Sequence, residues 1–261
     1  MSYEFIRLDY DDGLALLTFN RPRNLNALNI PMVEELLHAV DAVVEAGARC
    51  LLITGAGRGF CTGADLAAVD DGQGPPPDAG RPLEIYFNPL FLKLADLPMP
   101  IVTAVNGPAA GAGCSLALCG DIVIASDTAY FLQAFVNIGL VPDMGSTWLL
   151  PRLIGKARAQ AMMMLGERVT AIQALSWGMV YEVVDAEALP ARAQAVAAKL
   201  AAGPTLAHRL IRQGIRDGLE ESLIESLATE RRNQAIAGAS ADFAEGVAAF
   251  IEKRSPVFRG R

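Results

Sequence analysis

The sequence predicts an α/β protein whose strands are covered on both faces by helices. Short, almost continuous apolar runs such as CLLITG (50–55) and DIVIAS (121–126) are separated by longer segments. Strands that alternate with helices and lack a polar face are typical of a sheet buried on both sides. After about residue 186 the pattern is only helical. With 261 residues, 52% of them apolar, the chain can bury a substantial core in one large domain, or in one domain with an appendage.

The first predicted elements are a strand and an amphipathic helix. LALLTFN (14–20) has the composition of a strand. A helix is predicted over 31–46, because Pro31 suits a first turn and Gly47 suits the stop. Apolar side chains recur there at the spacing of one helix face, at Val33, Leu36, Leu37, Val40, Val43 and Val44.

The later elements follow from the same patterns. Further strands are predicted at 50–55, 101–107, 121–126, 129–135 and 179–185, and helices at 186–202, 204–217, 219–237 and 241–253. The segment DDGQGPPPDAGRP (70–82) is rich in Pro and Gly and is interpreted as a mobile loop or the edge of a lid.

Composition and charge exclude several classes of protein. The net charge of −7 argues against general nucleic-acid binding, which needs a basic face. No apolar run approaches the roughly 18 residues of a membrane span, and MSYEFIRLDYDDG lacks the apolar core of a secretory signal. The two histidines, His38 and His208, lie far apart in helical patterns, so no metal site is predicted. The four cysteines form no CxxC pair and are interpreted mostly as buried thiols, which suits a reducing cytosol and a cytoplasmic protein.

Three familiar catalytic motifs fail on their details. TGAGRGF (54–60) resembles the dinucleotide-binding turn of short-chain dehydrogenases, but Cys61 stands where a further Gly is required and no Tyr-x-x-x-Lys follows. No P-loop motif occurs. Ser115, in GCSLA, fails the G-x-S-x-G elbow of serine hydrolases, and no His lies near it in sequence.

Two turns of small residues remain, and each follows a predicted strand. They are GFCTGADL (59–66) and NGPAAGAGC (106–114). Small residues at a strand-to-helix turn let backbone N–H groups approach a ligand, and a helix N-terminus favours negative charge. Two such N–H groups aimed at one oxygen would form an oxyanion hole. The alternative is that both are tight turns in which small residues serve packing alone.

Taken together, five segments resemble the crotonase, or enoyl-CoA hydratase/isomerase, superfamily nearly from end to end. The segments are NRPRNLNALN (20–29), GRGFCTGADL (57–66), AVNGPAAGAGCSLALCGDIVIAS (104–126), GLVPDMGSTWLLPRLIG (139–155) and ADFAEGVAAFIEKRSPVF (241–258). The resemblance implies a CoA-thioester substrate, with CoA as part of the substrate and no separate cofactor. It also implies a spiral of β-β-α turns over residues 1–195 and a helical oligomerisation region over 196–261. The expected assembly is a homotrimer, or a hexamer built as a dimer of trimers.

The resemblance assigns roles to individual positions. The N–H groups of Ala64 and Ala112 would hold the thioester carbonyl as it becomes an enolate, with Gly111 beside them. The other expected contacts to CoA or the acyl group are Arg23, Asp65, Leu66, Ala67, Phe135, Leu140, Phe250 and Lys253. For Lys253 a solvated charge at a helix end is an equal alternative. Asp65 and Asp121 are also expected to have structural roles, as hydrogen bonders in turns and at helix ends.

The sequence departs from the hydratases of this superfamily at two positions. Those enzymes carry two Glu that bind and activate water, and this chain has Ser115 and Phe135 there. Without the carboxylates, addition of water has no evident acid and base. An efficient hydratase is therefore not expected.

One acidic residue, Asp143 in GLVPDMGST, matches a position at which some isomerases of the superfamily move a proton. The stretch 134–152 looks most like the ring-epoxide isomerase of phenylacetate degradation. An apolar pocket with Phe135, Val136 and Leu140 would raise the pKa of Asp143 and favour such a shuttle. The alternative for Asp143 is a turn or helix-capping residue after Pro142. An isomerase is the favoured function; a weak hydratase, dehalogenase or hydrolase and a non-catalytic CoA-ester binder are the alternatives.

Overall fold

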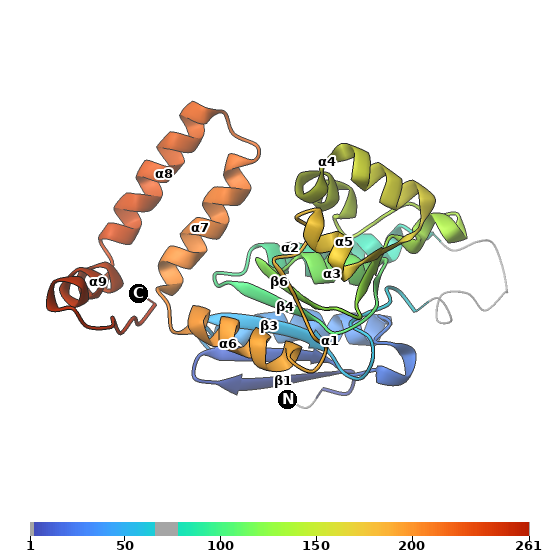
Figure 1. The fold of residues 1–261 in the computed structure, drawn as a ribbon, viewed down its shortest axis with the longest axis horizontal. Coiled ribbons are helices and arrows are strands. Elements are labelled where there is room, and N and C mark those ends of the chain that lie inside the picture. Colours follow the sequence, from blue (N-terminus) through green and yellow to red (C-terminus); the bar gives the residue numbers. More distant parts are fainter. Residues whose placement is uncertain (1–2, 66–77, 261) are drawn as a thin grey trace.

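The computed structural model describes residues 3–65 and 78–260, and its core is built on a six-stranded sheet (Figure 1). The strand order is β1-β2-β3-β4-β6-β9, and only the β1–β2 pair is antiparallel. The strands are β1 (Ile6–Asp11), β2 (Leu14–Phe19), β3 (Cys50–Gly55), β4 (Ile101–Val105), β6 (Ile122–Ser126) and β9 (Glu182–Val184). Four of them, β2, β3, β4 and β6, coincide with predicted strands.

A smaller second sheet makes the architecture a spiral. It contains β5 (Ala109–Ala110), β7 (Tyr130–Leu132) and β8 (Arg168–Thr170) in the order β5-β7-β8. The chain passes from β4 to β5, and from β6 to β7, and the isolated bridge between Cys61 and Ala109 adds the segment after β3. Successive turns thus contribute one strand to each sheet before a helix, as expected for the β-β-α spiral.

Helices cover both faces of the large sheet, which explains why its strands are apolar throughout. The face that carries Leu52 and Val102 packs against α6 (Leu189–Ala201). The opposite face, with Leu51 and Ile53, packs into the larger core. The helices on that side include α1 (Ile30–Glu45), α2 (Asn88–Ala95), which follows the π-helical segment η3 (Leu83–Phe87), α3 (Ala112–Leu118), α4 (Ser146–Leu165) and α5 (Ala171–Ser176).

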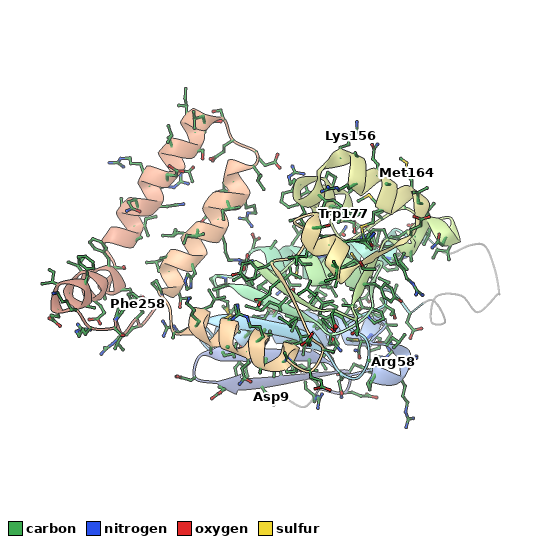
Figure 2. The ribbon with its side chains drawn as sticks, in the orientation of Figure 1. Asp9, Arg58, Lys156, Met164, Trp177 and Phe258 are labelled. Atoms are coloured by element: carbon green, nitrogen blue, oxygen red, sulfur yellow. The ribbon has the colours of Figure 1, made fainter. Side chains whose placement is uncertain are left out.

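Three C-terminal helices form an arm that extends from the core (Figure 1). They are α7 (Thr205–Gly218), α8 (Leu223–Gly238) and α9 (Ala241–Glu252). Core side chains crowd between the layers, whereas those of α8 project on both sides of the helix (Figure 2). Large apolar side chains on the arm are exposed, for example Ile224 at 81% and Phe250 at 85%. A face of this kind indicates an interaction surface.

Charged side chains join the arm to the core. Asp121 accepts a hydrogen bond from the N–H of Ile101 at 2.7 Å, and its carboxylate lies 2.7 Å from Nε of Arg212 on α7. Arg49, in the loop before β3, donates to Thr205 Oγ1 at 3.0 Å and to the carbonyl oxygen of Phe258 at 3.1 Å. The structural role expected for Asp121 is therefore present.

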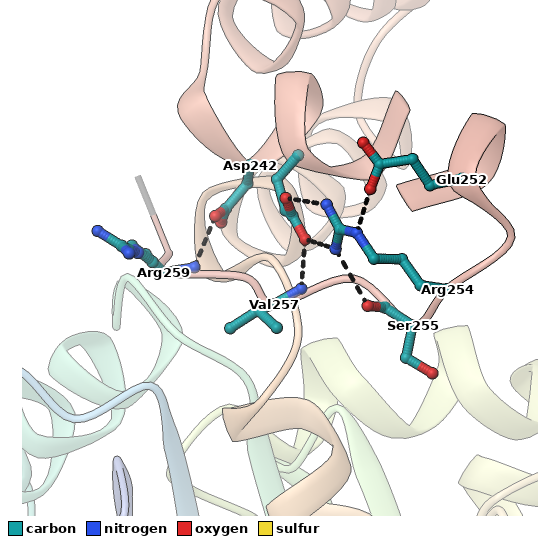
Figure 3. Close-up of polar contacts among 7 residues, drawn as sticks. Asp242, Glu252, Arg254, Ser255, Val257 and Arg259 are labelled. Atoms are coloured by element: carbon teal, nitrogen blue, oxygen red, sulfur yellow. Dashed lines mark hydrogen bonds and ion pairs between the residues drawn. The ribbon is translucent and has the colours of Figure 1, made fainter. Parts of the chain in front are cut away.

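The C-terminal tail folds back on α9 through two acidic side chains (Figure 3). The buried carboxylate of Asp242 accepts hydrogen bonds from the N–H groups of Arg259 and Gly260, at 2.6 and 2.7 Å. Glu245 pairs with Arg254 and also accepts the N–H of Val257 at 2.8 Å. These bonds give the tail a fixed path across the end of the arm.

Several predicted boundaries differ from the structure. The strand predicted at 129–135 ends at Leu132, because its partners β5 and β8 are themselves only two and three residues long. The chain then forms the 3₁₀ helix η4 (Ala134–Ile138). The strand predicted at 179–185 is reduced to β9, and the helix predicted from residue 219 begins at Leu223, where Ser222 and Glu225 form a capping box.

The predicted division between residues 195 and 196 falls inside α6. Ala197 and Ala201, late in this helix, are buried against the large sheet. The geometric boundary between core and arm therefore follows α6. A role of the arm in oligomerisation stays a prediction. Within residues 3–65 and 78–260, no helix combines the length and hydropathy required to cross a bilayer.

Candidate active site

A cavity of about 420 Å³ lies where the two small-residue turns meet the segments around η3 and η4. Its polar groups include Asp65, Asp78 and Asp143. The remaining lining is mainly apolar, with Leu28, Ile30, Pro82, Leu83, Phe87, Phe135, Ile138 and Leu140. A mostly apolar pocket with a few polar groups is the usual form of a small-molecule site. A larger open groove, about 880 Å³, lies between α7 and α8, outside this region.

The two turns are in backbone contact, and glycine makes this contact possible. Gly63 and Gly111 both have left-handed backbones, with φ of +89° and +53°. A Cβ atom on Gly63 would lie 2.9 Å from the carbonyl oxygen of Ala110 and 3.4 Å from the nitrogen of Ala112. The segments predicted to share one ligand oxygen therefore meet at this point.

The N–H groups of Ala64 and Ala112 have no backbone acceptor among the described residues. Ala64 lies between two ladder bonds, from Leu28 N–H to the Gly63 oxygen and from Asp65 N–H to the Leu28 oxygen, both 2.8 Å. Ala112 is the first residue of α3, where N–H groups lack an intrahelical acceptor. Both alanines line the cavity. This arrangement can act as an oxyanion hole.

An ion pair restrains the first of the two small-residue turns, 59–66. Arg21 Nη2 lies 2.8 Å from Asp65 Oδ2, and both side chains are only 15% exposed. Arg21 also donates to the carbonyl oxygen of Ala27. Because Asp65 directly follows Ala64, the pair restrains the backbone that carries the candidate oxyanion donor. This contact agrees with the structural role expected for Asp65. The sequence interpretation did not predict that Arg21 is its partner.

Asp143 is the carboxylate best suited to proton transfer. It lines the cavity, and its Oδ1 atom is buried without a hydrogen-bond partner among the described residues. Burial raises the pKa of this carboxyl group to about 6. At neutral pH the group is mostly ionised, yet it is a stronger base than an exposed aspartate. Phe135 and Leu140 contribute to the apolar lining, as expected, whereas Val136 does not line the cavity.

The backbone around Asp143 is tightly constrained. Met144, which is buried, has a left-handed backbone with φ of +45°, and Gly145 follows at +77°. A Cβ atom on Gly145 would lie 2.7 Å from the ring of Phe91. A non-glycine residue in this conformation persists only where its surroundings enforce it. The loop therefore presents Asp143 from a rigid frame.

The other predicted contacts divide into three groups. Leu66 and Ala67 lie outside the described residues. Arg23 is exposed in the 3₁₀ segment η1 (Pro22–Asn24) and does not line the cavity. Phe250 and Lys253, on α9 and at its end, also lie away from the lining. Their contacts with CoA stay predictions, and residues 70–77 of the predicted lid likewise lie outside the described residues.

The two positions that replace glutamate differ in accessibility. Phe135 lines the cavity, but Ser115 is 1% exposed and lies behind it in α3. The sequence interpretation did not predict that Leu83 and Phe87 line the cavity. The spacing of apolar residues over 83–95 could have predicted a helix there. The interpretation also missed Gln133 and Ser146, which are buried close to Ser115.

The cysteines have no property of nucleophiles. Burial raises the pKa of Cys50, Cys61, Cys114 and Cys119 to about 12, so each thiol stays protonated at neutral pH. None of them lines the cavity. Within the described part of the chain, no cluster of His, Cys, Asp and Glu has the makings of a metal site.

Comparison with known proteins shows the family of this chain. The profile of the enoyl-CoA hydratase/isomerase family matches residues 9–261. The chain belongs to the enoyl-CoA hydratase/isomerase family of enzymes. Among solved structures, the enoyl-CoA hydratase from Bacillus anthracis has a TM-score of 0.91 and 31% identity, with 99% of this chain and 100% of that chain covered.

Relatives within this family carry both isomerase and hydratase names. The chain is 49% identical to the 1,2-epoxyphenylacetyl-CoA isomerase of Escherichia coli K12, over 99% of each chain. It is 37% identical to a trans-2-decenoyl-(acyl-carrier-protein) isomerase of Streptococcus mutans, over 100% of each. It is 36% identical to the 2,3-dehydroadipyl-CoA hydratase of Escherichia coli K12, over 95% of this chain and 96% of the relative.

Proposed function

We propose that this enzyme is an acyl-CoA isomerase in which Asp143 moves the proton and the N–H groups of Ala64 and Ala112 bind the thioester oxygen. The observation that carries the proposal is the buried Oδ1 atom of Asp143, which has no hydrogen-bond partner among the described residues and lies in the same cavity as both alanines. Of the other carboxylates in that lining, Asp65 is held by Arg21 and Asp78 belongs to an exposed turn.

The reaction needs one base and one stabilised enolate. The Asp143 carboxylate removes a proton from C2 of a 3-enoyl thioester, and the electron pair moves onto the thioester oxygen. Ala64 and Ala112 donate hydrogen bonds to that oxygen and lower the energy of the enolate. The protonated Asp143 then delivers the proton to C4, which leaves a 2-enoyl thioester of unchanged mass.

Hydration is disfavoured because the described residues that line the cavity include no pair of glutamates to activate water. Ser115 is buried and hydrogen-bonded, and Phe135 offers no polar atom. A single carboxylate can shuttle a proton between two carbons, but addition of water requires both a base for water and an acid for carbon.

The identity of the relatives extends the proposed substrate class. A 49% identical relative is named as an isomerase of 1,2-epoxyphenylacetyl-CoA. The apolar lining suits a cyclic or linear acyl group, so opening of a ring epoxide in an aryl-acetyl thioester is the second candidate reaction. CoA is part of the substrate, and no further cofactor is proposed.

Assembly and location are proposed on the same basis. The exposed apolar side chains of the arm suit a homotrimer or a dimer of trimers, in which α7–α9 pack against neighbouring subunits. The free, protonated cysteines suit a reducing cytoplasm.

The proposal is tested by absorbance and mass measurements on the purified protein, with a 3-enoyl-CoA and a 2-enoyl-CoA as separate substrates. We expect the 3-enoyl substrate to become conjugated without a change in mass. A rapid gain of one water on the 2-enoyl substrate, with no conjugation of the other, would show that the enzyme is a hydratase.

A further inference from the structure

Three buried polar side chains lie directly behind the cavity, next to the loop that carries Asp143. Gln133, Ser115 and Ser146 are each no more than 1% exposed. They come from three elements: Gln133 precedes η4, Ser115 belongs to α3, and Ser146 is the first residue of α4. None of the three lines the cavity, so none can touch a substrate directly.

Their hydrogen bonds form a chain that ends at Asp143. Gln133 Nε2 lies 3.1 Å from Ser146 Oγ, and Ser146 Oγ lies 2.6 Å from Ser115 Oγ. Ser115 Oγ lies 3.3 Å from the carbonyl oxygen of Asp143. The same carbonyl accepts the N–H of Ser146 at 3.0 Å.

The acceptor at the end fixes the direction of every bond. A carbonyl oxygen only accepts, so Ser115 must donate its hydroxyl proton to Asp143. Ser115 can then only accept from Ser146, which therefore donates its own proton to Ser115. Ser146 in turn accepts from the amide of Gln133. Bonds aligned in one direction polarise and strengthen one another, particularly where water is excluded.

We propose that Ser115, Ser146 and Gln133 are positioning residues, which together lock the Asp143–Met144 peptide and thereby aim the Asp143 carboxylate into the cavity. Two donors on one carbonyl prevent that peptide from rotating. The strained backbone at Met144, with φ of +45°, is what such a lock has to maintain. Ser115, which stands where the hydratases carry a glutamate, would thus position Asp143.

The raised pKa of Asp143 comes from burial and not from a charged neighbour. Asp65 and Asp78 also line the cavity, and Asp65 is neutralised by Arg21. Cys114, beside Gln133, stays protonated because burial raises its pKa to about 12. If the lock fails, the carboxylate of Asp143 can turn toward water, and its pKa falls from about 6 toward the ordinary value of 3.8.

The test uses Ser115→Ala and Ser146→Ala, which each remove one oxygen atom. We expect kcat for 3-enoyl-CoA isomerisation to fall about 10- to 100-fold with KM within about threefold, because misplacement of a catalytic group by an ångström costs about this much. We also expect carbon NMR of the substrate-free protein to show a lower pKa for Asp143 in both variants. The proposal would be overturned if kcat stayed within about twofold of the unmodified enzyme and the pKa of Asp143 stayed within about 0.3 of its value there.

Ser126→Ala is the matched control. Ser126 is also fully buried and hydrogen-bonded, to the N–H of Thr128 at 3.1 Å, but it lies outside the cavity lining. If the two test variants lose only as much activity and thermal stability as this control, and the titration of Asp143 is unchanged, the chain of bonds is merely structural and the proposal fails.

The inference rests on the proposed function, but the two can fail separately. An unmodified enzyme that does not isomerise the 3-enoyl substrate overturns the proposed function. The NMR titration needs no substrate and still decides whether the chain of bonds controls Asp143.

Discussion

Replacing Asp143 by Asn is expected to lower kcat for isomerisation of a 3-enoyl-CoA by about 100- to 10,000-fold, the usual contribution of a general base. The amide keeps the shape of the side chain but cannot accept a proton from C2. Binding of the CoA ester, measured by calorimetry, should change little, because the oxyanion donors and the apolar lining remain. A variant that turns over at the rate of the unmodified enzyme would remove Asp143 from the mechanism.

The stability of Asp143→Asn tests the raised pKa of Asp143. Burial raises the pKa of Asp143 to about 6 from 3.8, so the folded state binds more protons than the unfolded state between these values. The free energy of unfolding therefore falls as pH rises from about 4 to 6 and stays lower above it. Asp143→Asn should be more stable than the unmodified protein at pH 8, by about 1–3 kcal/mol, and not at pH 3.5. Equal stability differences at both values of pH would contradict the raised pKa.

Replacing Gly63 by Ala is expected to lower kcat about 100- to 1,000-fold, as does the loss of one oxyanion donor. The new Cβ atom would lie 2.9 Å from the carbonyl oxygen of Ala110, so the two turns must separate. Separation moves the N–H of Ala64 away from that of Ala112, and one oxygen can no longer reach both. Steady-state kinetics with a 3-enoyl-CoA measures the effect.

Gly47→Ala separates this effect from the cost of a left-handed backbone. Gly47 has φ of +69°, similar to Gly63, but a Cβ atom there meets nothing within 4 Å. Both variants should lose about 1 kcal/mol of stability for the backbone conformation alone. Only Gly63→Ala should lose activity; a kcat within threefold of the unmodified enzyme in folded Gly63→Ala would contradict the oxyanion hole.

The parts of the site that lie in short, contiguous motifs could be predicted from the sequence. Small residues at Gly63, Ala64, Gly111 and Ala112 indicated a close backbone approach, and the structure brings the two turns into contact. The place of Asp143 in the cavity was predictable because its position matched a family motif. Its apolar neighbours indicated that its pKa would be raised. The apolar strands also predicted a sheet covered on both faces, since their periodicity had no polar side.

Features that depend on contacts between distant segments could not be predicted in this way. Gln133 stands in an apolar run and Ser146 at a helix start, and either pattern has an ordinary local explanation. Their importance appears only when α3, α4 and the segment before η4 meet. The end of β7 at Leu132 likewise follows from its short partner strands β5 and β8, whose lengths the sequence pattern does not indicate.

Transfer of an isotope within one turnover tests most directly whether a single carboxylate moves the proton. A 3-enoyl-CoA with two deuterons at C2 is converted in ordinary water, and the product is analysed by mass spectrometry and NMR. Delivery by Asp143 predicts a measurable fraction of product with deuterium at C4. The same fraction of deuterium at C4 in product formed by Asp143→Asn would contradict the one-carboxylate mechanism, because another group would then carry the deuteron from C2 to C4.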